Sequence, residues 1–201
     1  MVTKKINNVI ERFEDQYFYS EKVGTYLFNL SNEILLFDLP TYSKEIKQYL
    51  ISKKLPIRAI LSHGPCGIAD GDRWQKELGI TIFLHKADKS NEWLQMVPDV
   101  LFDTLPSLPE TLELIHKPGH TPGSVCLLEK TTKSLLTGDT VEGTENGEIY
   151  DFTYQSSGTK ERLISAEKLL QYEFENIFPF HYEPIVGVAK KSLKRFVSLH
   201  S

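Results

Sequence analysis

Strand-like and helix-like segments alternate along the whole chain, and this alternation constrains the fold more than any other feature. Residues 25–30 and 33–38 are rich in aliphatic and aromatic side chains, and the Ser-Asn pair between them predicts a β-hairpin. Further strands are predicted at 57–62, 80–84, 111–116, 124–129, 134–137 and 176–180, and helices at 43–53, 73–78, 159–172 and 189–199. This order predicts an α/β layered sandwich, in which two β-rich halves pack face to face with helices outside.

The composition is that of a folded protein with one core. Apolar residues make up 40% and charged residues 25% of the 201 residues, which excludes intrinsic disorder. A chain of this length can bury a sizeable core, and we expect a single domain over residues 1–201. The two cysteines, Cys66 and Cys126, form neither a disulfide framework nor a CxxC metal motif.

Charge and hydropathy narrow the classes of partner. The formal net charge is −4, and the chain has no basic stripe, so we expect no nucleic-acid partner. The longest apolar runs are far shorter than the ~20 residues that span a bilayer, so we expect no membrane partner. The first six residues lack the apolar segment of a signal peptide. We therefore expect a cytoplasmic protein that acts on a small-molecule substrate; the sequence carries no signal for an oligomeric state.

Strand-like runs are followed at once by four side chains of the types that bind metals. These are His63, His120, Asp139 and His181. Strand ends are rigid, and the loops that leave them are where open α/β folds place ligands. Imidazole and carboxylate groups are ligands for zinc and for non-haem iron. A lone histidine at a strand end more often packs or caps, but four such positions, three of them in loops that contain glycine and proline, favour a metal site. We expect packing or terminal positions for His85, His116 and His200.

The motifs around these four residues resemble those of the metallo-β-lactamase superfamily. They read SH at 62–63, PGHTPGS at 118–124, LTGD at 136–139 and FH at 180–181, in the order and approximate spacing of that family. The resemblance extends from about residue 24 to about residue 183. It implies a four-layer αββα sandwich with its metal site at the edge between the two sheets.

The first metal-binding loop departs from the pattern of this family. The family motif is HxHxDH, whereas this chain reads HGPCGI from His63 onward. Pro65, Gly67 and Ile68 therefore stand in place of the second histidine, the aspartate and the last histidine, and none of these side chains can bind a metal. In the family, the lost aspartate and third histidine belong to the second ion, and the aspartate orients the attacking water. The resemblance thus implies one divalent ion, zinc or iron, or none.

By the same resemblance, the remaining ligands divide into two groups. His63, His120 and the bridging-position Asp139 belong around the first ion. His181 belongs to the side of the second ion, where it either completes a four-ligand set or stands free as an acid or base.

Accessory roles are open for three further residues. Cys66 is either a thiolate ligand or an inert buried cysteine. Asp70 is either a substitute carboxylate or part of the cap of the helix at 73–78, for which Asp72 fits well. Asp38, by its family position, supports the first metal loop through backbone hydrogen bonds. Five aromatic residues either line a substrate pocket or simply pack: Tyr150, Phe152, Tyr154, Phe180 and Tyr182.

Three functions follow from these observations, and we rank a metal-dependent hydrolase with an altered, mononuclear site first. The second is a non-catalytic binding protein that keeps the fold, because the first metal loop has lost its water-orienting carboxylate. The third is a mononuclear iron persulfide or thiol dioxygenase-like enzyme. The superfamily's persulfide dioxygenases use the positions matched here by His63, His120 and Asp139, and two imidazoles with one carboxylate suit iron(II). Hydrolysis of β-lactams is not expected, because secreted lactamases need an export signal.

Overall fold

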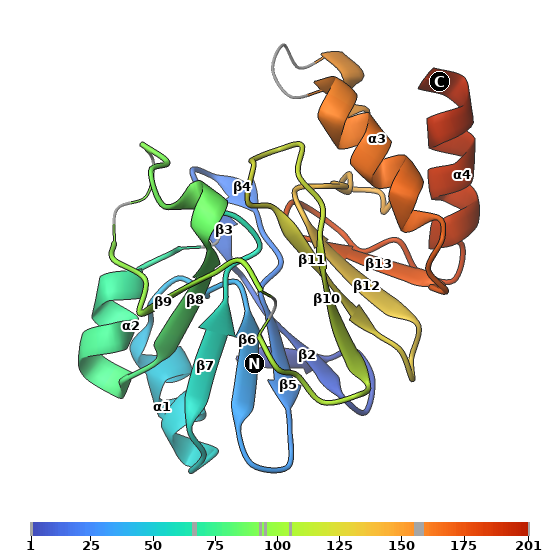
Figure 1. Cartoon of the computed structure of the whole chain (residues 1–201). Helices are drawn as coiled ribbons and strands as arrows, with labels where there is room; N and C mark the ends of the chain where they lie inside the picture. The colour runs from blue at the N-terminus through green and yellow to red at the C-terminus, as the bar shows by residue number, and fades with distance from the viewer. Residues whose placement is uncertain are drawn as a thin grey trace.

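Two large β-sheets lie face to face in the computed structural model (Figure 1). The structure describes residues 2–65, 68–92, 94, 96–104, 106–154 and 159–200. Within these residues, the first sheet has the strand order β1-β2-β5-β6-β7-β8-β9, and the second has the order β10-β11-β12-β13. A small separate hairpin, formed by β3 and β4, lies between β2 and β5 in the sequence.

The strands of the first sheet are β1 (Thr3–Lys5), β2 (Ile10–Phe13), β5 (Tyr26–Asn29), β6 (Ile34–Phe37), β7 (Ile57–Ile60), β8 (Thr81–His85) and β9 (Val100–Phe102). Those of the second sheet are β10 (Leu112–His116), β11 (Val125–Glu129), β12 (Ser134–Gly138) and β13 (Asn176–Pro179). The hairpin consists of β3 (Tyr17–Phe18) and β4 (Glu21–Lys22).

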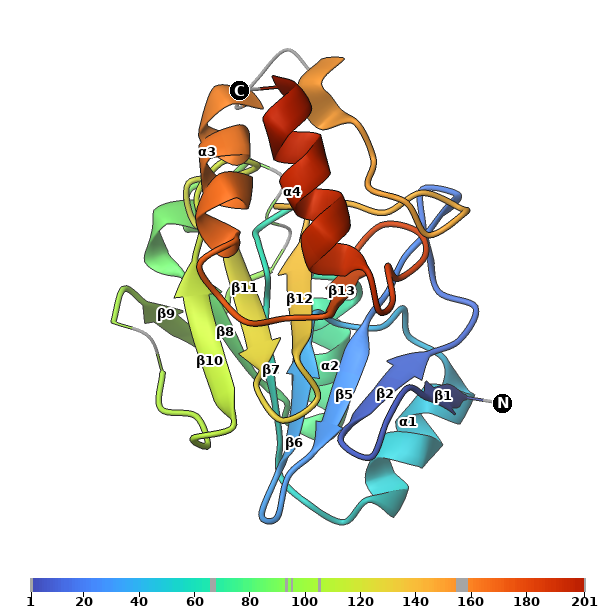
Figure 2. The same cartoon turned by 90° about the vertical axis from the view of Figure 1, so that its right-hand side faces the viewer.

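Helices cover the outer face of each sheet (Figure 2). The first sheet is covered by α1 (Lys44–Ser52) and α2 (Gly71–Leu78), and the second by α3 (Thr159–Leu169) and α4 (Ala189–His200). Two short 3-10 helices are η1 (Lys86–Asp88) and η2 (Phe152–Tyr154). The expected αββα sandwich is thereby confirmed. Among the described residues, no helix combines the length and the apolar character needed to cross a membrane.

The apolar runs of the strands are explained by burial on both faces. In β6, Ile34 and Leu36 belong to the cluster under the helices of the first sheet, whereas Leu35 and Phe37 belong to the cluster between the two sheets. Successive side chains of a strand point to opposite faces, so a strand that is covered on both sides reads as a continuous apolar run. The layered arrangement therefore follows from strands whose two faces both need an apolar layer to pack against.

The start of α2 differs from the prediction. The residue before the helix is Asp70, with a left-handed backbone (φ 50°), and its side chain makes no capping hydrogen bond. Asp72, predicted as the cap, lies inside the first helical turn. The difference has a physical cause, because the Asp70 carboxylate accepts a hydrogen bond from the backbone N–H of Tyr42 at 2.7 Å instead.

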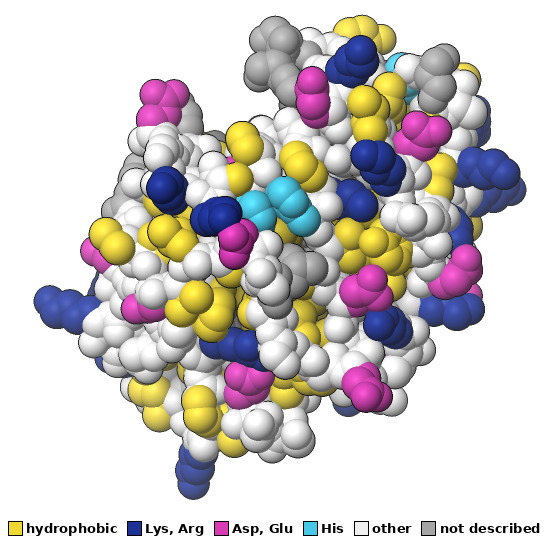
Figure 3. All heavy atoms as spheres, in the orientation of Figure 1, with side chains coloured by type: hydrophobic (Ala, Val, Ile, Leu, Met, Phe, Trp, Pro, Cys, Tyr) yellow, Lys and Arg dark blue, Asp and Glu magenta, His cyan; other side chains and the backbone are white. Residues whose placement is uncertain are grey.

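The molecular surface mixes charges of both signs. Basic and acidic side chains are interspersed over the face drawn in Figure 3. Some of them form exposed ion pairs, such as Lys130 with Glu113 at 3.0 Å. Water and salt screen such pairs, so they contribute little to stability compared with the apolar clusters.

Candidate metal centre

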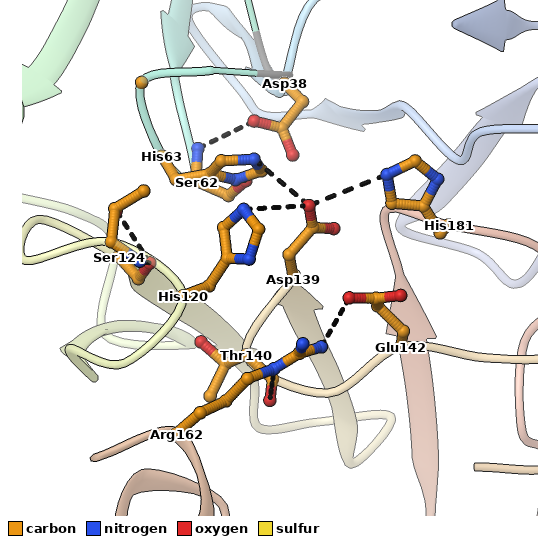
Figure 4. Close-up of polar contacts among 12 residues, drawn as sticks. Asp38, Ser62, His63, His120, Ser124, Asp139, Thr140, Glu142, Arg162 and His181 are labelled. Atoms are coloured by element: carbon orange, nitrogen blue, oxygen red, sulfur yellow. Dashed lines mark hydrogen bonds and ion pairs between the residues drawn. The ribbon is translucent and has the colours of Figure 1, made fainter. Parts of the chain in front are cut away.

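Four loops meet at one end of the sandwich, between the two sheets (Figure 4). They follow β7, β10, β12 and β13, and they carry His63, His120, Asp139 and His181 respectively. Because β10 and β12 each pair antiparallel with β11, and β12 pairs parallel with β13, these three strands end at the same edge of the second sheet. The carboxyl ends of such strands commonly form ligand sites.

A single carboxylate oxygen lies at the centre of the cluster. Asp139 Oδ2 lies 3.2 Å from His63 Nε2, 3.5 Å from His120 Nε2 and 3.6 Å from His181 Nε2. One donor atom from each of His63, His120 and Asp139 lies within 4.8 Å of the other two. The sequence-predicted ligands are therefore close enough together to surround one ion.

The chemistry of this donor set fits a divalent cation. The Asp139 side chain is 1% exposed, and its Oδ1 has no hydrogen-bond donor among the described residues. Such a buried acceptor without a partner costs free energy, and a cation beside it would remove that cost. Carboxylate and imidazole together are a common ligand set for zinc and iron.

The electrostatics keep Asp139 and His120 in the protonation states that bind metals. Burial alone would raise the pKa of Asp139, but His63, His181 and His120 hold it well below its usual range. Burial lowers the pKa of His120 to about 4, although Asp139 opposes this shift. Asp139 is therefore ionised and His120 neutral near pH 7, with an imidazole lone pair available for a metal.

His63 is oriented by its neighbours on the first sheet. Its Nδ1 lies 2.8 Å from Ser62 Oγ, and the backbone N–H of Ser62 donates to Asp38 Oδ1 at 2.7 Å. Asp38 is buried and has a left-handed backbone (φ 62°), and burial raises its pKa to about 6. Gly138 packs directly on this loop, since a Cβ atom at this position would lie 2.5 Å from Ser62 Cβ. The loops of the two sheets are thus in direct contact beside His63 and Asp139.

Asp88 joins the loops that carry His63 and His120. It is buried at the end of η1, where its Oδ2 accepts from the Gly64 N–H at 2.9 Å and from Thr121 Oγ1 at 2.7 Å. Its Oδ1 accepts from the Gly123 N–H at 2.7 Å. Sequence reasoning did not identify this role; the only signal was that Asp88 follows a predicted strand in a stretch that resembles the family.

His181 is held by the N-terminal part of the chain. Glu21 Oε2, on β4, lies 3.3 Å from His181 Nδ1. The Gly24 N–H donates to the Phe180 carbonyl at 2.6 Å, and Val23 forms a β-bridge with His181. Residues before the predicted hairpin therefore help to place His181. The sequence predicted His181 as a donor but did not predict this support.

A buried ion pair lies beneath Asp139 (Figure 4). Arg162 of α3 donates from Nη2 to Glu142 Oε1 at 2.5 Å and from Nε to the Thr140 carbonyl at 3.2 Å. Burial and the nearby Asp139 raise the pKa of Glu142, whereas Arg162 opposes this shift. Removal of one partner of such a pair leaves an uncompensated buried charge. The pair therefore fixes the loop that follows β12.

A cavity of about 740 Å³ opens beside the donors. His120 and His181 form part of its wall, together with Phe18 and Tyr19 of the β3–β4 hairpin. The aromatic residues expected near Asp139 and His181 do not line it within the described residues. Phe152 and Phe180 are buried in packing contacts, whereas Tyr150, Tyr154 and Tyr182 are at least partly exposed elsewhere.

Comparison with known families agrees with this geometry. Residues 68–181, more than half of the chain, match a family model described as the metallo-beta-lactamase superfamily. The chain belongs to this superfamily. A search of curated proteins gave no match.

Solved structures with the metallo-β-lactamase fold superimpose over nearly the whole chain. DIM-1 metallo-beta-lactamase has a TM-score of 0.78 and 15% identity, covering 99% of this chain and 97% of that chain. A metallo-beta-lactamase from Pontibacter korlensis has a TM-score of 0.76 and 16% identity, covering 98% and 97%. A metallo-beta-lactamase family protein from Thermus thermophilus has a TM-score of 0.69 and 17% identity, covering 98% and 80%. At these identities the likeness shows the fold.

The first metal loop of the superfamily is altered in this chain. The family match begins at Ile68, the last position of that loop. Pro65 and Ile68 line the cavity but offer no donor, and Cys66 and Gly67 lie outside the described residues. Asp70 also lines the cavity, where its carboxylate is bonded to Tyr42. Among the described residues of this loop, His63 alone carries a side chain that can bind a metal.

Proposed function

We propose that the chain is a metal-dependent hydrolase that holds one divalent ion with His63, His120, Asp139 and His181. The observation that carries this proposal is the position of three imidazole Nε2 atoms within 3.6 Å of one buried carboxylate oxygen, at the edge of a cavity. Membership of a metal-dependent superfamily supports it. The volume of the cavity, about 740 Å³, suits a small-molecule substrate.

A single ion is proposed because the first metal loop lacks the donors for a second. Proline, glycine and isoleucine occupy positions 65, 67 and 68, where the superfamily motif has two histidines and an aspartate. Zinc and iron(II) both suit the remaining imidazole and carboxylate ligands.

When bound, a divalent ion supplies a Lewis acid that polarises a substrate carbonyl and lowers the pKa of a coordinated water. The residues of the chain prepare the site for this chemistry. With a metal ion on Nε2 of His63, Nδ1 would carry the ring proton and donate a hydrogen bond to Ser62 Oγ. Glu21 faces Nδ1 of His181 in the same way. Asp139 Oδ1 has no donor among the described residues, so it would be available to a divalent ion.

Metal content is the first test of this proposal. We expect one zinc or iron ion per chain by elemental analysis after reconstitution, and metal-dependent hydrolysis within a panel of esters, thioesters and lactones. His120→Ala should abolish both, whereas the control His200→Ala should change neither, because His200 lies at the end of α4.

Each contrary outcome points to another function. Failure to bind stoichiometric zinc, manganese or iron would contradict the hydrolase and favour a non-catalytic binding protein. Bound iron, with oxygen consumption in the presence of a persulfide and no hydrolysis, would favour a dioxygenase. The cluster of two histidines and one carboxylate supports the dioxygenase.

A further inference from the structure

The cavity beside the donor cluster carries acidic side chains on its wall. Glu21 comes from β4, and Asp70 and Asp72 come from the start of α2. Among the described residues, no lysine or arginine lines the cavity. The residues that the structure does not describe include no lysine or arginine. The charge of the wall therefore comes from carboxylates alone.

The basic residues nearest in sequence to these carboxylates are engaged elsewhere. Lys22, next to Glu21, pairs with Glu183 at 2.5 Å. Arg73, next to Asp72, pairs with Glu77 at 2.9 Å and stacks on the Tyr42 ring. Neither Lys22 nor Arg73 lines the cavity, so neither positive charge lies on its wall.

The site stays negative even when one ion is counted. A divalent ion brings a charge of about +2, whereas the three wall carboxylates carry about −3. The buried Arg162–Glu142 pair beneath the cluster cancels itself. Asp70 is held in place by the Tyr42 N–H, so its charge stays at the wall. An anionic substrate would therefore meet repulsion on approach, whereas a cation would be attracted.

The rest of the wall is apolar and aromatic. Phe18 and Tyr19 of the β3–β4 hairpin, together with Ile68 and Met96, line the same cavity. Aromatic faces close to carboxylates bind ammonium groups through cation–π and charge attraction. Apolar side chains also accept an uncharged acyl chain.

We infer that this site takes esters, thioesters or lactones that are uncharged or carry an ammonium group, and that it discriminates against anionic substrates. The inference rests on the proposed hydrolase function. Hydrolysis adds water across the acyl C–O or C–S bond; the acyl carbon gains the hydroxyl oxygen, and the leaving alcohol or thiol takes a proton. The acid that forms loses its own proton to solvent, and the acidic wall repels the resulting carboxylate, which favours release of the product.

Three thioesters with the same thiol leaving group test this inference. Their acyl chains end in trimethylammonium, tert-butyl or sulfonate, which are similar in shape and differ in charge. We expect kcat/KM of the metal-loaded protein to be highest for the ammonium substrate and at least about tenfold lower for the sulfonate than for the tert-butyl substrate. High ionic strength should narrow these differences, because salt screens the wall.

Variants link the preference to the wall. Asp72→Asn removes one charge from the cavity wall and leaves the four donor residues unchanged. The ratio of kcat/KM between the ammonium and sulfonate substrates should fall, mainly through a change in KM. The matched control Glu110→Gln removes an exposed carboxylate outside the cavity lining, and it should leave this ratio unchanged.

The outcomes separate the two proposals. Equal kcat/KM for the three substrates, or a preference for the sulfonate, would overturn the inference and leave the hydrolase intact. If protein that holds metal hydrolyses neither these thioesters nor the panel of esters and lactones, the hydrolase proposal fails. Calorimetric binding of the three matching amides, which resist hydrolysis, then still tests the charge preference: the ammonium amide should bind most tightly and the sulfonate amide most weakly, and any other order overturns it.

Discussion

The two sheets contribute unequally to the candidate metal centre. The first sheet supplies one donor, His63, whereas the loops of the second sheet supply His120, Asp139 and His181. The first loop nevertheless keeps its supports, because Asp38 holds the Ser62 N–H and Asp88 holds the Gly64 N–H. The path of a metal loop is thus fixed by hydrogen bonds to its backbone, which do not depend on its donor side chains.

The backbone on either side of His63 is held from outside the loop, because Asp38 accepts from the Ser62 N–H and Asp88 from the Gly64 N–H. We therefore expect substitutions at Pro65 and Ile68 to leave His63 in place. The following predictions test this division, from the largest expected effect to the smallest.

Asp139→Asn tests the contribution of the second sheet. The substitution removes the negative charge that faces three imidazoles. We expect the metal affinity to fall by more than about 100-fold, because loss of a residue that only supports a ligand already lowers it about 10–100-fold. Competition with a chromophoric chelator measures the change. Asp103→Asn, an exposed carboxylate, is the control and should bind metal like the parent. Equal affinity of the Asp139 variant and the parent would remove Asp139 from the site.

Restoring the first loop tests the loss of donors. The triple variant Pro65→His, Gly67→Asp and Ile68→His should raise the metal content from one ion to two per chain, measured by elemental analysis. Ile68 is 7% exposed in an apolar cluster, so we expect a cost in stability of about 1–3 kcal/mol from the buried imidazole.

The matched control for this variant is a triple alanine substitution at the same positions. It changes the loop without adding donors and should keep one ion. A second ion that fails to bind to a folded triple variant would contradict the view that the loop backbone keeps its metal-binding path.

Asp88→Asn tests the supports of the loop. The amide cannot accept all the hydrogen bonds from Gly64, Thr121 and Gly123, so we expect metal affinity to fall about 10–100-fold. Chelator competition measures the affinity, and the d–d spectrum of the cobalt-substituted protein should shift because the donor geometry changes.

A second aspartate provides the control for this substitution. Asp99 also accepts a backbone hydrogen bond, from Ile82 at 2.8 Å, on the same sheet. Asp99→Asn should lower stability by about 1–3 kcal/mol and leave metal affinity unchanged. If both variants lose affinity equally, the effect of Asp88 is general destabilisation rather than positioning of the loops.

The smallest effect is expected at Glu11, on β2 of the first sheet. Its carboxylate would have a raised pKa from burial, but hydrogen bonds from Tyr49, Thr3 and Asn29 lower it to about 2. The folded state therefore binds a proton at Glu11 less tightly than the unfolded state does. The stabilisation of the fold by the ionised Glu11 carboxylate is complete above about pH 4.5 and is lost as the pH falls towards 2.

Glu11→Gln should therefore lower the free energy of unfolding at pH 7 by about 1 kcal/mol or less. The difference from the parent should shrink below pH 4.5 in urea denaturation. Metal affinity at pH 7 should stay unchanged, because Glu11 lies outside the donor cluster. A stability difference that grows with acid would contradict the lowered pKa of Glu11.

Much of the fold could be predicted from local patterns. The predicted hairpin corresponds to β5 and β6, which pair antiparallel from Tyr26–Phe37 to Asn29–Ile34. The predicted helix at 43–53 corresponds to α1, whose cap Ser43 accepts from the Ile46 N–H at 3.0 Å. In both cases neighbouring residues contain the whole signal, as apolar periodicity or as a capping side chain.

The short edge strands could not be predicted in this way. β1 reads Thr-Lys-Lys and is largely exposed, so it lacks an apolar pattern and exists only because it pairs with β2. The hairpin of β3 and β4, which carries Glu21, has only two residues in each strand. Their positions depend on contacts with distant parts of the chain, which a local pattern does not contain.

The candidate site also contains residues that the sequence predicted and residues that it did not. The motifs predicted that His63, His120, Asp139 and His181 would converge, and their side chains lie together; their role as metal ligands stays a prediction. The residues that hold them could not be predicted, because each support acts over a long separation in sequence. Asp88 contacts Gly123, 35 residues away, through a single carboxylate that resembles any surface aspartate in the sequence.

The junction between the beginning and the end of the chain affects when the donor cluster can form during synthesis. Arg12 of β2 donates from Nη2 to the carbonyl of Tyr182 at 2.7 Å, next to His181. Domains emerge from the ribosome N-terminus first, at about 5–20 residues per second, so His63 and His120 are made well before β13. Only His181 is missing from the nascent chain until β13 has been made. Under the proposed function, we expect the four-ligand set to form, and to take up its ion, only after this last strand has been added.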